Sequence, residues 1–124
     1  MFDLNENTRY YMCTSPMSMQ KGIKGLSNLI MIETGFNPIS GAAYVFFSRD
    51  RKQVKILRWD VDGFVLYQKR LVKGRFKVPQ VFDTSKSCIE LNWDTFYMIM
   101  RGIRFVSISY DKRFNLRTSS GIGI

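Results

Sequence analysis

The sequence predicts an α+β fold: an antiparallel sheet built on a central three-stranded meander (about 43–77), with one helix before it (about 18–33) and one after it (about 93–101). Three observations lead to this prediction. Two β-favouring runs flank an Asp-Gly turn, two other segments carry apolar residues at helical spacing, and 45% of the 124 residues are hydrophobic. That length and apolar content suit one core. We therefore expect one domain over 1–110 and a basic, mobile tail over 111–124.

The first third of the chain predicts a strand and then a helix. TRYYMC (8–13) is short and rich in β-favouring residues. From Ser18 the apolar residues recur at helical spacing, Ser18 suits the N-cap, and Gly35 suits a left-handed C-cap. Gly22 and Gly25 lie about one turn apart inside this helix. Either they mark the close approach of another backbone, or they weaken the helix by about 1 kcal/mol each relative to alanine.

The middle of the chain predicts the meander. AYVFFS (43–48) is apolar enough for a strand buried on both faces. VKILRWD (54–60) and FVLYQKRL (64–71) follow as two further strands, joined by the tight turn DVDG. KGRFKVP (73–79) is expected to continue as an edge strand that Pro79 ends, because proline cannot donate a ladder hydrogen bond.

The last third predicts a second helix. Asn92 is placed to cap a helix over 93–101, and Gly102 falls at its C′ position. Asp94 in the first turn is favoured by the helix dipole. RFVSISY (104–110) has the composition of one more strand.

Positive charge is the feature of the composition that bears most on function. The formal net charge of +9 favours a polyanionic partner, nucleic acid first and an anionic membrane surface second. Ten of the nineteen basic residues fall within 49–77 against three acids, so this stretch carries +7. It predicts either a phosphate-binding surface or a sheet edge that charge protects from aggregation. The candidate DNA contacts are Lys21, Arg49, Arg51, Lys52, Lys55, Lys69, Arg70, Lys73, Arg75 and Lys77.

Aromatic residues interleave with these cations at Trp59, Phe64, Tyr67 and Phe76. Aromatic side chains beside a basic stripe either stack on bases or pack the opposite face of the sheet, and packing is the commoner use. Lys73, Arg75 and Lys77 recur at period 2 and would share one side of a strand. The sequence therefore predicts a basic side of the sheet, with the aromatics more often in the core.

The residue types that support catalysis are sparse. The chain has no histidine, which is the commonest general base and metal ligand, and no Walker, GxSxG or HExxH motif. Asp60 and Asp62 could together hold a divalent cation, as in a metal-dependent nuclease, but aspartates beside a glycine more often shape a turn. Cys13 and Cys88 are expected to be buried, reduced thiols. We expect no enzyme activity, no cofactor and no metal.

Location and membrane attachment are predicted from what the chain lacks. The N-terminal MFDLNENTRYY has no basic-then-apolar signal pattern, and no apolar run approaches the roughly 18 residues of a membrane span. The cytoplasm is the expected compartment, with no membrane partner.

Three blocks of sequence resemble one known family. They are PMSMQKGIKGLSNLI (16–30), NPISGAAYVFFSRDRKQVKIL (37–57) and RWDVDGFVLYQKRLVKGRF (58–76). In order and spacing they are similar to the accessory protein, encoded by the second open reading frame and often called TnpB, of bacterial insertion sequences of the IS sixty-six family. The positions that carry the resemblance include Pro16, Gly22, Gly25, Pro38, Gly41, Trp59, Asp60, Asp62, Gly63, Phe64, Tyr67 and Phe76.

The resemblance implies a role in DNA transposition beside a separate, larger transposase that carries the catalytic acids. The expected function is non-specific DNA binding by a non-catalytic accessory factor. The alternative is an adaptor that docks on the transposase through apolar residues such as Phe46, Phe47, Tyr97 and Met98. The chain departs from the family pattern at several positions, which are Ser18, Gln20, Lys24 and Asn37, Asp50 within an arginine run, and Val61 in place of glycine.

Overall fold

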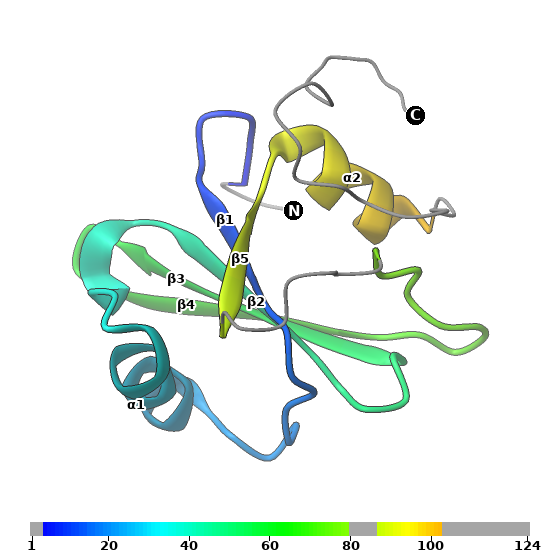
Figure 1. Cartoon of the computed structure of the whole chain (residues 1–124), viewed down its shortest axis with the longest axis horizontal. Helices are drawn as coiled ribbons and strands as arrows, with labels where there is room; N and C mark the ends of the chain where they lie inside the picture. Colours follow the sequence, from blue (N-terminus) through cyan, green and yellow to red (C-terminus); the bar gives the residue numbers. More distant parts are fainter. Residues whose placement is uncertain (1–3, 80–86, 103–124) are drawn as a thin grey trace.

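The computed structural model describes residues 4–79 and 87–102, which form one five-stranded sheet and two α-helices (Figure 1). The elements in chain order are β1 (Tyr10–Cys13), α1 (Ile23–Thr34), the short 3₁₀ helix η1 (Pro38–Ser40), β2 (Ala43–Phe47), β3 (Gln53–Asp60), β4 (Gly63–Arg70), β5 (Cys88–Leu91) and α2 (Trp93–Arg101). The fold is therefore α+β. The predicted strand at 104–110 and the predicted tail at 111–124 lie outside the described residues.

The sheet is mixed rather than purely antiparallel. Its strand order is β4-β3-β2-β1-β5, and β1 pairs with β2 in parallel while every other pair is antiparallel. A parallel pair needs a long crossover between its strands. Residues 14–42 supply that crossover and include α1. The prediction of an antiparallel sheet is therefore wrong at the β1–β2 pair.

The meander is present in outline but is shorter than predicted. β2, β3 and β4 pair in chain order, and β4 ends at Arg70. Residues 71–79 leave the sheet, because Gly74 adopts a left-handed φ of 75° and Phe76 turns inward to 4% exposure. The Phe76 ring packs 5.7 Å from the Phe47 ring, centroid to centroid. The predicted edge strand at 73–79 is therefore wrong.

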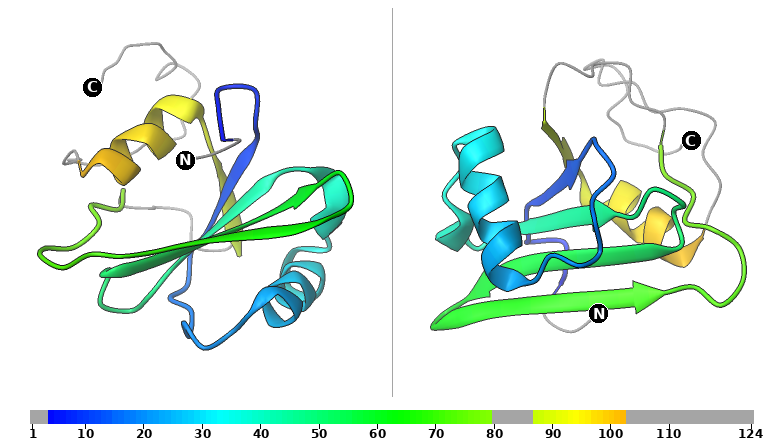
Figure 2. Two further views of the ribbon diagram at one scale, coloured as in Figure 1. Left: turned by 180° about the vertical axis from the view of Figure 1, so that it is seen from behind. Right: turned by 90° about the horizontal axis from the view of Figure 1, so that it is seen from below.

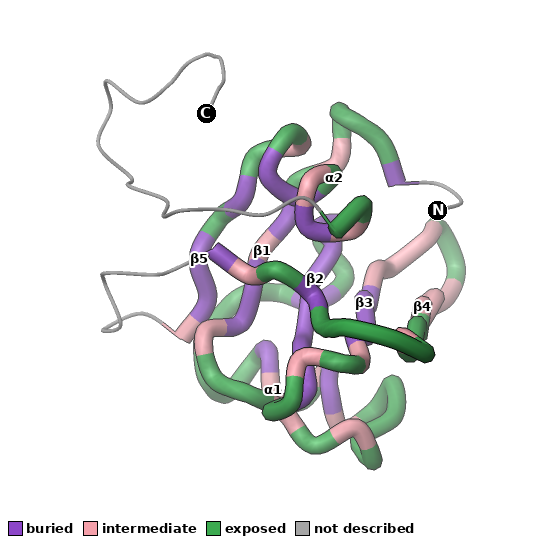
Figure 3. Tube along the Cα trace, turned by 90° about the vertical axis from the view of Figure 1, so that its right-hand side faces the viewer, coloured by how far each residue is buried: buried purple, intermediate pink, exposed green. Residues whose placement is uncertain are grey.

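The two helices cover opposite faces of the sheet (Figure 2). On one face, Phe96 of α2 stacks on Tyr10 of β1 with ring centroids 4.2 Å apart. On the other face, Leu26 and Ile30 of α1 pack with Tyr44 of β2 and other buried residues of the sheet. All five residues of β2 are buried, which confirms the prediction of a strand covered on both sides; Figure 3 shows the burial concentrated in the central strands.

The two helix starts differ in how well the sequence predicts them. α2 spans the predicted residues, with the Asn92 side chain accepting a hydrogen bond from the Thr95 N–H at 2.8 Å and Gly102 left-handed. α1 begins at Ile23, five residues after the predicted Ser18, and its N-cap Gly22 supplies no side-chain bond. The predicted N-cap at Ser18 is therefore wrong.

The α1 glycines are not sites of close backbone approach. A Cβ built on Gly22 meets nothing within 4 Å, and one built on Gly25 meets first the Lys21 side chain, at 3.5 Å. The close-approach interpretation is therefore wrong. The weakened-helix interpretation remains for Gly25, whereas Gly22 is the N-cap and lies outside the helix interior. Among the described residues no helix is both long and apolar enough to cross a bilayer.

Candidate nucleic-acid interface

The β2–β3 turn is the first part of the site, and its own polar groups hold its shape. The Ser48 hydroxyl donates to the Asp50 carboxylate at 2.7 Å and accepts from the Gln53 N–H at 3.1 Å. The same Asp50 oxygen accepts from the Lys52 N–H at 3.0 Å. Arg51 takes a left-handed φ of 62° within this turn. Asp50 and Ser48 thus fix the backbone that carries the turn's cations, Arg49, Arg51 and Lys52.

The segment after β4 is the second part of the site and lies against the same turn. The Leu71 N–H donates to the Lys52 carbonyl at 2.8 Å, and the Phe76 N–H donates to the Arg51 carbonyl at 2.7 Å. Phe76 anchors the segment in the core, while Lys73 and Arg75 on either side of Gly74 are exposed. This segment and the β2–β3 turn therefore form one surface.

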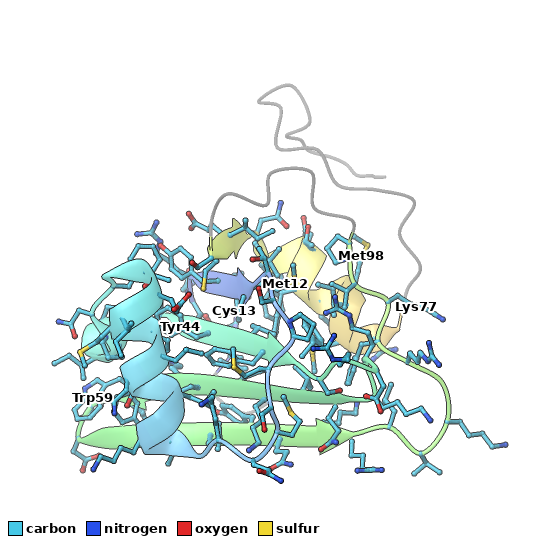
Figure 4. The ribbon with its side chains drawn as sticks, turned by 60° about the horizontal axis from the view of Figure 1, so that its bottom comes forward. Met12, Cys13, Tyr44, Trp59, Lys77 and Met98 are labelled. Carbon is cyan, nitrogen blue, oxygen red and sulfur yellow. The ribbon has the colours of Figure 1, made fainter. Side chains whose placement is uncertain are left out.

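Eight cations gather at this end of the sheet. They come from the turn, the last two residues of β4 and the following segment: Arg49, Arg51, Lys52, Lys69, Arg70, Lys73, Arg75 and Lys77. We call this surface the basic end. Figure 4 shows Lys77 at the end of the strands opposite to the end where Trp59 lies. Seven of the eight side chains are exposed, and Arg51 is half-buried.

The basic end is left electrostatically open. Within the described residues the one salt bridge joins Arg9 to Glu90, at 3.2 Å, and involves none of the eight cations. Asp50 is the acid of this surface, and the Ser48 hydroxyl and Lys52 N–H that bind its carboxylate lower its pKa. Arg51 lies over the Phe47 ring at 5.7 Å from its centroid, and burial lowers its pKa. The cations are therefore available to an external anion.

Lys55 is not part of this surface. Its side chain is 5% exposed, and Nζ donates to the carbonyls of Met19 and Lys21, each at 2.7 Å. The prediction that Lys55 contacts DNA is therefore wrong. Lys55 also points to the face opposite to that of Lys69, because Lys55 of β3 pairs with Gln68 of β4 and the adjacent Val54 pairs with Lys69. The ammonium instead fastens the chain that leads into α1.

Two other basic residues lie away from the basic end: Lys21, which is a predicted DNA contact, and Arg58, which is not. Lys21 is exposed, but its backbone is held over β3 by Lys55. Arg58 lies toward the far end of β3, where Nε donates to the Gly41 carbonyl at 3.2 Å. The structure therefore brings together eight of the ten basic residues of 49–77, at one end of the sheet rather than along one side of a strand.

The predicted aromatics differ in burial: Phe76 is buried, whereas Trp59, Phe64 and Tyr67 are half-buried. Phe76 and Tyr67 join the core on the α2 face, and Phe64 packs on the α1 face. Trp59 meets Phe64 edge-to-face, with centroids 5.0 Å apart. The core interpretation therefore fits Phe76, Tyr67 and Phe64.

The predicted aspartate pair shapes a turn. Asp60 and Gly63 are paired across the hairpin, and the Asp62 N–H donates to the Asp60 carbonyl. Within residues 4–79 and 87–102, no three His, Cys, Asp or Glu side chains come together in a metal-binding arrangement. Val61 between the two aspartates is left-handed, with φ 56°. This is the position at which the family pattern has glycine.

A cavity at the opposite end of the sheet was not predicted. It has a volume of about 550 Å³ and is lined by Arg9, Tyr11, Phe36 and Arg58 among others. Gly41 of the family motif also lines it. The lining residues come from separate segments of the chain, so no local pattern in the sequence signals this cavity.

Comparison with known proteins identifies the family. A family model described as "IS66 Orf2 like protein" matches residues 8–109. The chain is 23% identical over 108 residues to the uncharacterized protein y4jC of Sinorhizobium fredii (strain NBRC 101917 / NGR234), covering 87% of this chain and 90% of the relative. It is 30% identical over 79 residues to the uncharacterized protein y4hO of the same organism, covering 64% and 69%. No solved structure matches.

The matched range contains all three blocks of sequence that resemble the insertion-sequence accessory protein, and it contains every cation of the basic end. Membership implies an accessory role in transposition. The chain belongs to the family of IS66 Orf2-like proteins.

Proposed function

We propose that the protein is a DNA-binding accessory factor in transposition and that the basic end of the sheet contacts DNA phosphates. The observation that supports this proposal is the convergence of eight cations from three chain segments, with no carboxylate in salt-bridge contact with them among the described residues. Positive side chains that track a phosphate backbone bind most DNA sequences alike, because phosphates carry no base information. The expected binding is therefore non-specific.

The salt dependence of DNA affinity is the quantity that tests this proposal. Each phosphate neutralised by a lysine or arginine releases condensed counterions, so log K falls with log salt by about 0.9 per contact. Six contacts at the basic end give a slope of about −5. We expect titration of a labelled duplex with the full chain at several salt concentrations to give a slope of this order.

Two matched variants locate the surface. Arg75→Gln removes one exposed charge from the basic end, and Arg9→Gln removes one from the opposite end, beside the start of β2. Both variants lower the net charge by one. Arg75→Gln should reduce the slope by about 0.9, and adding Lys73→Gln and Lys52→Gln should reduce it further. Arg9→Gln should leave it nearly unchanged.

Equal effects of Arg75→Gln and Arg9→Gln would show attraction to the net charge rather than to this surface. Absence of binding at low salt would end the DNA-binding proposal altogether. Circular dichroism of each variant checks that the fold is intact.

A second candidate function, docking on the transposase, is favoured by a different observation. Phe46 and Phe47 cannot serve as docking residues, because they are 0% and 1% exposed. Of the eight exposed large apolar side chains in the described residues, five lie on α1 or in the chain just after it: Ile23, Met31, Ile32, Phe36 and Ile39. Exposed apolar side chains concentrated in one stretch of the chain are a feature of protein contacts.

Co-purification with the transposase of the same element tests this adaptor function. Ile32→Ser on α1 is compared with Val72→Ser, because both side chains are well exposed, at 77% and 99%, and Val72 lies in the segment of the basic end. Loss of the complex with Ile32→Ser alone supports docking through α1. Unchanged recovery of both variants, or no recovery of the wild type, contradicts it.

A further inference from the structure

Cys13 and Cys88 are the two cysteines of the chain, and they face each other across the β1–β5 pair. Their Sγ atoms are hydrogen-bonded at 2.9 Å, although 75 residues separate them in sequence. Both thiols are buried, at 8% and 9% exposure. Nothing in the proposed DNA contact or in the family role uses this pair.

The backbone geometry at the pair suits a covalent cross-link. The neighbouring Thr14 N–H donates to the Ser87 carbonyl at 2.9 Å, so Thr14 and Ser87 form a hydrogen-bonded pair and Cys13–Cys88 is the adjacent non-hydrogen-bonded pair. Residues opposed in this way have Cα atoms about 4.5 Å apart, which lies within the range of disulfide-bonded cysteines, about 4.4–6.8 Å. The register of the two strands is therefore compatible with a bond between the sulfurs.

There is space for a small reagent beside the pair. Both cysteines line a cavity of about 270 Å³ between the sheet and α1, together with Met17, Leu29 and Glu33. That volume holds a molecule a few atoms in size, so the cavity suits a small oxidant.

The two sulfurs are already in contact. They share one hydrogen bond, in which either sulfur can be the donor. Because the thiolate is the nucleophile, the sulfur that ionises first attacks the oxidant, and its partner is then the resolving thiol.

We propose that Cys13 and Cys88 form a reversible intramolecular disulfide when the protein meets a hydroperoxide. The thiolate of one cysteine attacks one peroxide oxygen, the O–O bond breaks, and with one proton the products are a sulfenic acid and water. The sulfur of the other cysteine then attacks the sulfenic acid sulfur, its proton leaves with the displaced hydroxide, and a second water forms. Two thiols lose two electrons and two protons in total, and hydrogen peroxide is reduced to two waters.

The bond has a defined structural consequence. β5 is an edge strand that pairs with β1 alone among the described strands, and α2 follows it after one residue. The disulfide ties the first residue of β5 to the last residue of β1, on the face of the sheet that α1 covers. Oxidation is therefore expected to stabilise the β1–β5 pair without changing a residue of the basic end.

Hydrogen peroxide treatment of the purified, reduced full chain tests the proposal. Intact mass should fall by two hydrogen atoms, and a non-reduced digest should contain one peptide pair that joins Cys13 to Cys88. Dithiothreitol should restore the starting mass. The oxidised chain should melt at a Tm higher by about 5–10 °C, since a disulfide that closes a loop of this length stabilises native structure.

Two single variants test whether both sulfurs are needed. Cys13→Ser and Cys88→Ser should each fail to lose two hydrogen atoms, and a remaining thiol that reacts should stay a sulfenic acid, seen as a gain of one oxygen, because no resolving thiol is present. Disulfide-linked dimers in place of the internal bond, or an oxidised wild type whose Tm does not rise, would overturn the proposal.

Discussion

Lys55 is a charged residue inside the protein, on the face of the sheet that α1 covers. Nothing in its local sequence distinguishes it from the exposed lysines nearby, because it alternates with apolar residues as a solvent-facing strand residue does. Lys55 differs from those lysines because its ammonium group donates to the carbonyls of Met19 and Lys21, which lie far away in sequence. A buried ammonium is tolerated where such acceptors meet it.

Substitution separates this structural lysine from a DNA-contacting one. Lys55→Met removes a charged donor and leaves two carbonyls without it, so we expect the free energy of unfolding to fall by about 2–3 kcal/mol. Lys69→Met, on the exposed side of the same strand pair, should change it by at most about 0.5 kcal/mol. Urea denaturation gives both values. DNA affinity should show the reverse pattern: Lys69→Met should weaken binding, and Lys55→Met should change it little. A loss of affinity by Lys55→Met without a loss of stability would contradict the structural role of Lys55.

Asp50 provides a pH-dependent test at the same scale. Its folded-state pKa is lowered by the Ser48 hydroxyl and the Lys52 N–H, so its carboxylate contributes stability that is complete above the ordinary aspartate pKa of 3.8. That contribution is lost as the pH falls through the lower, folded value. The stability difference between wild type and Asp50→Ala should therefore begin to shrink as the pH falls below 3.8 and should shrink further as the pH passes the lower, folded-state pKa. Asp62→Ala, in the other hairpin turn, is the control, and a difference for Asp50→Ala that persists in acid would contradict the assignment.

At the scale of the element, the sequence predicts those helices and turns whose formation depends on adjacent residues. The second helix has an asparagine able to cap it and a glycine able to end it, and the structure has both caps at Asn92 and Gly102. The hairpin between β3 and β4 likewise depends on four adjacent residues, and it forms where the Asp-Gly signal predicts it.

Elements that depend on distant partners are the ones the sequence does not predict. The parallel register of β1 with β2 is set by the crossover that contains α1, and TRYYMC carries no mark of strand direction. The 73–79 segment has the alternation of a strand, yet Phe76 finds its place against Phe47, and Gly74 allows the turn that brings it there. The basic end follows from this tertiary arrangement. The sequence shows which residues are charged, but it does not show that these segments meet at one end of the sheet.

The β3–β4 turn yields a prediction of its own. Val61 is a β-branched residue with φ 56°, a conformation that costs non-glycine residues about 1–2 kcal/mol, and its side chain is 89% exposed. Val61→Gly relieves that cost and loses no packing, so even after the greater entropy of glycine in the unfolded chain we expect a gain of about 0.5–1 kcal/mol. Val72→Gly, equally exposed but without a positive φ, should lose stability. Thermal unfolding of both variants decides; a loss by Val61→Gly would contradict the strained turn.

At the scale of the whole molecule, charge is divided between the two ends of the sheet. The eight cations of the basic end surround one acid, Asp50, whereas Asp60 and Asp62 occupy the hairpin turn at the other end. An asymmetric field of this kind orients a protein as it approaches a polyanion, before any contact is made. The β3–β4 turn is therefore expected to face away from bound DNA.

The same layout predicts an order of local stabilities. β2 is buried along its whole length and is paired on both sides, so its amides should exchange with solvent only through global unfolding. Residues 72–75 are exposed and lie outside the sheet, so their amides should exchange through local opening. Native-state hydrogen exchange measures both, and protection at 72–75 equal to that of β2 would contradict the layout.

β1 lies between β2, its neighbour in the first half of the chain, and β5, whose Cys88 is 75 residues beyond Cys13. During translation β2, β3 and β4 can pair as hairpins, because they are adjacent in sequence. At that stage β1, the first strand synthesised, still lacks a partner on one side. Its second neighbour reaches it only after most of the polypeptide has left the exit tunnel. A ribosome that stalls before residue 88 therefore presents an unfinished edge, which is the kind of surface that chaperones shield and proteases remove.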